Sequence, residues 1–97
     1  MPTTILIANK AGNFAENKDV ARELRLKFIT PTLKDSDDEI ILDFSGVTGA
    51  TQSFVHAMIS QLIRDYGDEL FNRLLFKDCN PAVKQIVNIV ADYMAES

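Results

Sequence analysis

The residues whose types and spacing could support chemistry lie in one stretch, 43–54. It begins with Asp43, passes Gly46 and Gly49, and runs through the polar triplet 51–53 into an apolar repeat. Two hydroxyls at a helix start indicate first that one of them caps free backbone N–H groups. The same N–H groups and the positive end of the helix dipole also stabilise an anion, so a phosphate could be accommodated. Phosphorylation of Ser53 would add about −1.5 to −2 charges at neutral pH.

The sequence gives less support to nucleophilic catalysis, metal binding or nucleotide binding by a P-loop. His56 follows Ser53 by three residues and could act as its base, but a regular helix supplies no oxyanion hole and no third orienting group. The one His and the one Cys, Cys79, are far apart and lack metal-ligand spacing. No Gly-Lys-Ser or Gly-Lys-Thr follows the glycines, which excludes a P-loop. We therefore expect no catalysis, no cofactor and no metal.

The elements that must position these residues can be read from apolar periodicity. The β-branched run 3–8 predicts a strand, and glycine and asparagine near position 12 predict a turn after it. Apolar residues at helical spacing predict a helix from an Asn17 N-cap to Ile29, with Pro31 as its stop. The continuous apolar run 39–44 predicts a central strand that is covered on both faces.

The second half of the chain repeats this pattern. Apolar residues from Phe54 onward predict a long helix that begins near Thr51 and ends at Gly67. Residues 74–76 predict a third strand, and Asn80-Pro81 predicts the cap and first residue of a final helix to about Tyr93. Apolar residues cover more than half of this last helix, so we expect it to be buried on two sides or to meet a partner. The predicted fold is one α/β domain over residues 1–97, in β-α-β-α-β-α order, with a small, mostly parallel sheet packed against helices.

Composition narrows the class of protein. The chain has 97 residues and a net charge of −4, which disfavours a nucleic-acid partner because such affinity comes largely from Lys and Arg. The single cysteine excludes an internal disulfide and fits a reducing compartment. No stretch approaches the roughly 20 apolar residues that span a bilayer. We expect a cytoplasmic protein that contacts no membrane.

The run Ile40 to Phe54 resembles the signature of STAS domains, the anti-sigma-factor antagonists of bacteria. Counting from Asp43, the serine that antagonists present to a kinase matches Ser53, and the serine before it matches Gln52. Thr51 replaces an acid of that motif and Phe54 replaces a glycine. The chain is closer to the STAS-like family of uncharacterised function, which it resembles from about Gly12 to Met94, including the segments 66–71 and 80–83.

This resemblance implies a non-catalytic bacterial regulatory domain, which acts in partner switching with a histidine-kinase-like ATP-binding protein or an anti-sigma-like protein. It makes Ser53 the candidate phosphoacceptor. The candidate contacts with a partner or a phosphate are Asp43, Gly46, Gly49, Thr51, Gln52 and Phe54. The alternative is a structural or oligomerisation module without a phospho-switch, in which the last helix forms a homodimer seam through Ile89, Tyr93 and Met94.

Overall fold

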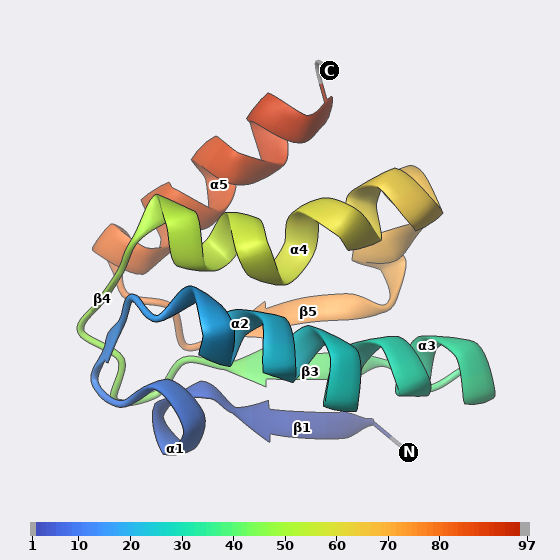
Figure 1. Ribbon diagram of the computed structural model, residues 1–97, viewed down its shortest axis with the longest axis horizontal. Helices are drawn as coiled ribbons and strands as arrows, with labels where there is room; N and C mark the ends of the chain where they lie inside the picture. Colours follow the sequence, from blue (N-terminus) through green and yellow to red (C-terminus); the bar gives the residue numbers. More distant parts are fainter. Residues whose placement is uncertain (1, 96–97) are drawn as a thin grey trace.

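The computed structural model describes residues 2–95 as two packed layers, one of strands and one of helices (Figure 1). The strands are β1 (Thr3–Leu6), β2 (Phe14–Ala15), β3 (Ile40–Asp43), β4 (Gly49–Ala50) and β5 (Leu74–Lys77). The helices are α1 (Ile7–Ala11), α2 (Lys18–Leu24), the π-helix η1 (Arg25–Ile29), α3 (Thr30–Asp35), α4 (Gln52–Tyr66), the 3₁₀-helix η2 (Gly67–Asn72) and α5 (Pro81–Ala95). The predicted α/β class and the order of the main strands and helices are confirmed, and shorter elements are added between them.

The main sheet has three parallel strands in the order β1-β3-β5, so the 39–44 segment is central as predicted. The row Ile5, Leu42 and Phe76 faces the helices, whereas the neighbouring row Thr4, Ile41 and Leu75 is partly or largely exposed. Right-handed crossovers between adjacent strands place both connecting helices on the same face. The expectation that the central strand is covered on both faces is therefore wrong.

The first strand ends earlier than predicted. It stops at Leu6, and residues 7–11 form α1 instead of continuing to Ala8. The helical turn brings Ile7 into the core, where it is fully buried. Gly12 ends α1 with φ 77°, a conformation that favours glycine, and its N–H donates to the carbonyl of Ala8 at 2.9 Å.

The prediction that Pro31 stops its helix is also wrong. The chain stays helical from Lys18 to Asp35, and Figure 1 shows α2 and α3 as parts of one rod. Proline lacks an N–H, and its ring clashes with the carbonyl four residues earlier in a regular α-helix. The π-helical turn η1, just before Pro31, widens the backbone at this place. The Thr32 hydroxyl then donates to the Phe28 carbonyl at 2.9 Å.

The predicted N-caps Asn17 and Asn80 are confirmed, and Thr51 is the capping hydroxyl of the two that the sequence left open. The Asn17 side chain accepts from the N–H of Asp19 at 2.8 Å, and Asn80 accepts from the N–H of Val83 at 2.8 Å. Thr51 accepts from the N–H of Phe54 at 3.1 Å. Each cap contributes about 1 kcal/mol to stability. Long α4 ends at Gly67, again as predicted.

Arg73, just before β5, ties three segments together. Its guanidinium donates to the carbonyl oxygens of Leu33 at 3.0 Å, Ser36 at 2.6 Å and Asp38 at 2.9 Å, and to that of Thr32 at 3.4 Å. These carbonyls belong to the end of α3 and to the loop after it, where helical partners run out. One planar cation thus fixes the acidic loop 35–39 against the start of β5.

We predict that Arg73→Lys lowers the free energy of unfolding by about 2 kcal/mol, because a lysine cannot reach several carbonyls in one plane. Urea denaturation would measure this loss. The matched control is Arg64→Lys, at an exposed arginine of α4, which should change stability by less than about 0.5 kcal/mol. Equal effects of the two substitutions would contradict the role of Arg73.

Candidate functional site

The loop after β3 is held by its own polar side chains. The Ser45 N–H donates to the Asp43 carboxylate at 2.8 Å, and the Ser45 hydroxyl donates to Asp78 at 3.0 Å. Asp78 lies after β5 and has φ 56°. Gly46 has φ 81°, which explains the glycine at this turn. The carboxyl ends of β3 and β5 are therefore joined through side chains.

A second, two-stranded sheet connects this loop to the N-terminal segment. Parallel β2 and β4 pair Phe14 with Gly49 and Ala15 with Ala50. The N–H of Thr51 donates to the Ala15 carbonyl at 2.9 Å. A Cβ at Gly49 would lie 2.9 Å from Cε1 of Phe14, so any other residue here would displace this half-exposed ring. This pairing spans 35 residues in the sequence, and no local pattern predicted it.

The start of α4 separates the roles of the two hydroxyls. Thr51 is the N-cap, so the capping function leaves Ser53 unused. Ser53 and Gln52 are exposed, and within residues 2–95 the Ser53 hydroxyl makes no hydrogen bond. A free serine hydroxyl is consequently displayed in the first turn of α4.

Ser53 lines an open hollow of about 380 Å³. The other residues of its lining are Lys18, Gln52, His56 and Ala57. Lys18 comes from the start of α2, which packs against α4. Figure 1 shows the starts of both helices at the same end of the molecule, next to β4. Sequence reasoning missed Lys18, because only the β2–β4 pairing brings it to this place.

His56 lies beside the same hollow but forms no nucleophile–base pair with Ser53 in this structure. Among residues 2–95, no hydrogen bond joins the two side chains and no third group orients the imidazole. The arrangement can present a hydroxyl, an amide and a cation to an incoming molecule.

The remaining predicted site residues have structural roles. Phe54 is fully buried, so it anchors α4 in the core, and the expected partner contact at this side chain is not met. Asp43 is only 8% exposed, and its carboxylate is used by its own loop. Gly46 and Gly49 shape the backbone and do not line the hollow.

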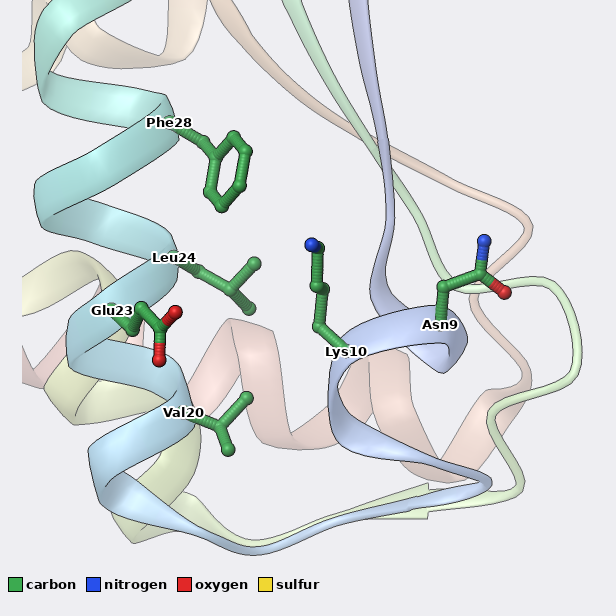
Figure 2. A pocket seen from close by; sticks show the side chains of 6 residues that line it. All are labelled: Asn9, Lys10, Val20, Glu23, Leu24 and Phe28. Atoms are coloured by element: carbon green, nitrogen blue, oxygen red, sulfur yellow. The ribbon is translucent and has the colours of Figure 1, made fainter.

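A second, smaller hollow of about 160 Å³ lies between α1 and the α2–η1 rod (Figure 2). The side chain of Lys10 points into it, and its ammonium lies 4.8 Å from the centre of the Phe28 ring. The other lining residues are Asn9, Val20, Glu23 and Leu24. None of the predicted site residues reaches this hollow, which forms because α1 packs beside α2.

Residues 2–95 contain neither a metal-binding cluster nor a membrane-spanning helix. No three His, Cys, Asp or Glu side chains in this range group closely enough to hold a metal ion. No helix in it has the length and apolar character that crossing a membrane requires. Burial raises the pKa of the half-buried Cys79 thiol, so the unreactive protonated form is favoured.

The structure defines a small parallel α/β domain with a displayed serine at the start of its long helix. The model of a family described as a STAS-like domain of unknown function matches residues 20–84, two thirds of the chain. The chain therefore belongs to this STAS-like family, and the resemblance to a STAS-like family of uncharacterised function is confirmed. The match contains β3, the start of α4 and β5, but not β1, β2, Lys18 or most of α5. Comparisons with curated proteins and with solved structures found no match.

We predict a pH-dependent contribution of Asp43 to stability. The Ser45 side chain and the Ser45 N–H lower the pKa of Asp43, and Lys77 adds to the effect. Ionised Asp43 therefore stabilises the fold above its unfolded-state pKa of about 3.9, and this contribution is lost as the pH falls through the lower folded-state pKa. Asp43→Asn should melt at a lower temperature than the wild type near neutral pH, with a gap that shrinks in acid. A gap that does not change with pH would contradict this assignment.

Proposed function

We propose that this protein is a non-catalytic regulatory domain that acts by partner switching and carries its phosphoacceptor at Ser53. The observation that supports this most strongly is the free, exposed hydroxyl in the first turn of α4, released from capping by Thr51. Membership of a STAS-like family supports a regulatory role. Because Ser53 has no structural bond to lose, its modification leaves the fold intact.

The proposed partner is a histidine-kinase-like ATP-binding protein or an anti-sigma-like protein of bacteria, as the family resemblance implies. In the transfer step the Ser53 oxygen attacks the γ-phosphorus of the partner's ATP, and the bond from that phosphorus to the β,γ-bridging oxygen breaks. ADP leaves, and the hydroxyl proton passes to a base of the partner or to water. The product carries about −1.5 to −2 additional charges on a chain whose net charge is already −4.

The new charge can control binding at small energetic cost. A change of about 1.4 kcal/mol alters an association constant tenfold. A docked partner would contact Ser53 and the exposed Gln52 together, since both lie on the rim of one hollow. Phosphorylation would then place a dianion in a desolvated interface, which favours release.

We predict that Ser53→Asp weakens binding to a histidine-kinase-like ATP-binding protein from the same genome at least about tenfold, whereas Ser53→Ala binds like the wild type. Ser53→Asn is the matched control, because it has the shape of aspartate without its charge. Titration calorimetry would give the affinities, and mass spectrometry after incubation with ATP should map the added phosphate to Ser53. Equal binding of the Asp and Asn variants, with no phosphate at Ser53, would sink the proposal.

A second candidate function, oligomerisation, is favoured by one surface of α5. Val83, Val87 and Val90 bury one face of this helix, yet Ile89 and Tyr93 on another face are 41% and 63% exposed. Met94, the third residue of the expected seam, is only 6% exposed and belongs to the core, so it does not contribute to this surface. Ile89 and Tyr93 are four residues apart, so they are neighbours on the helix. An exposed apolar pair of this kind suits contact with the same surface of a second copy.

We predict that, if this surface forms a homodimer, light scattering after size-exclusion chromatography gives twice the chain mass of 10.8 kDa. The double substitution Ile89→Gln and Tyr93→Gln should restore the monomer. Leu26→Gln, at a residue of η1 that is 55% exposed, is the control that should leave the mass unchanged. A wild-type monomer at high concentration would rule out this second function and leave the phospho-switch untouched.

A further inference from the structure

The register of the small sheet sets Lys18 opposite Ser53. Ala15 pairs with Ala50 in parallel, and both chains then run on in the same direction into α2 and α4. Lys18 lies three residues beyond Ala15, and Ser53 lies three residues beyond Ala50. Lys18 and Ser53 therefore occupy equivalent positions in two neighbouring, parallel segments. Both residues line the 380 Å³ hollow.

Lys18 is also uncommitted, unlike two other lysines nearby in the fold. Lys27 pairs with Glu23 at 3.2 Å, and Lys10 lies over the Phe28 ring. Within residues 2–95, the ammonium of Lys18 forms no ion pair and no hydrogen bond. A free cation thus stands beside a free hydroxyl in one concave surface.

His56 completes this surface from the next turn of α4. It is half-buried and lines the hollow together with Lys18 and Ser53. An imidazole and an ammonium both donate hydrogen bonds, and a phosphoserine offers three strong acceptor oxygens. We propose that, once Ser53 is phosphorylated, Lys18 and His56 bind the phosphoryl group within the same molecule and so bridge the starts of α2 and α4.

This inference rests on the proposed function for the modification, but it needs no particular kinase or partner. Phosphorylation would then change the surface of this domain that faces a partner in two ways. It adds negative charge at Ser53, and it engages the Lys18 ammonium, which is no longer available to the partner. Charge-assisted hydrogen bonds to phosphate are among the stronger ones in proteins. The bridge should therefore stabilise the phosphorylated domain.

The test installs phosphoserine at position 53 during translation, so that no kinase is involved. Phosphorylation should raise the melting temperature of the wild type by about 2–5 °C at low salt, and the gain should fall as salt screens the pair. Lys18→Gln should lose most of the gain, and His56→Gln should lose part of it. Lys18→Glu should turn the gain into a loss. The control is Lys34→Gln, at an exposed lysine near the far end of the same helical rod, which should keep the full gain.

The proposal would be overturned if phosphorylation raised the melting temperature of Lys18→Gln as much as that of the wild type. It would also be overturned if Lys18→Gln and Lys34→Gln reduced this increase equally. A full gain in His56→Gln would remove the imidazole from the site. These outcomes are distinct from those of the binding experiment. The bridge can form around an installed phosphoserine even if no kinase modifies Ser53, and a kinase can modify Ser53 even if Lys18 does not bind the phosphoryl group.

Discussion

The arrangement of the site depends on one short pairing of backbone segments, 13–15 with 48–51. Its hydrogen bonds run from Thr48 N–H to the Asn13 carbonyl at 2.7 Å and from Thr51 N–H to the Ala15 carbonyl at 2.9 Å. They fix the residue at which α4 begins, because the second bond holds the N-cap itself. They also bring the start of α2 to the start of α4. The absence of a side chain at Gly49 lets the Phe14 ring lie against this pairing.

The one-sided sheet explains why the start of α4 exposes polar side chains while the rest of the helix is largely used for packing. All the long helices share a single layer, in which α4 packs against both α2 and α5. Its apolar side chains Phe54, Met58 and Ile59 are fully buried beneath it. The helix therefore uses one face and both flanks for the core. Its first turn, which directly follows β4, keeps the side chains of Gln52 and Ser53 exposed.

Polar side chains that donate to carbonyl groups far away in the sequence hold this layer in place. Arg73 does so at the end of α3, and the Asn80 amide donates to the Thr48 carbonyl at 2.9 Å, which ties the site loop to the start of α5. Arg25, in the π-helical turn, donates to the Ala57 carbonyl at 2.9 Å, close to the hollow. The carbonyls that Arg73 and Asn80 bind lie in the last turn of α3 or in loops, whereas the carbonyl of Ala57 lies inside α4. Polar groups thus fix the geometry that the apolar core alone leaves adjustable.

The sequence by itself determined the local features: the caps at Asn17 and Asn80, a hydroxyl cap at the start of the long helix, the three main strands, and the serine in that helix's first turn. These features depend on residues within about four positions of one another, where side-chain capping and apolar periodicity act. Only the tertiary structure decided that the helix runs through Pro31 and that Lys18 and Ser53 line one hollow. The physical reason is that burial and long-range contact follow from how strands far apart in the chain pair and from which face the crossovers cover, and neither is encoded in any short run of residues.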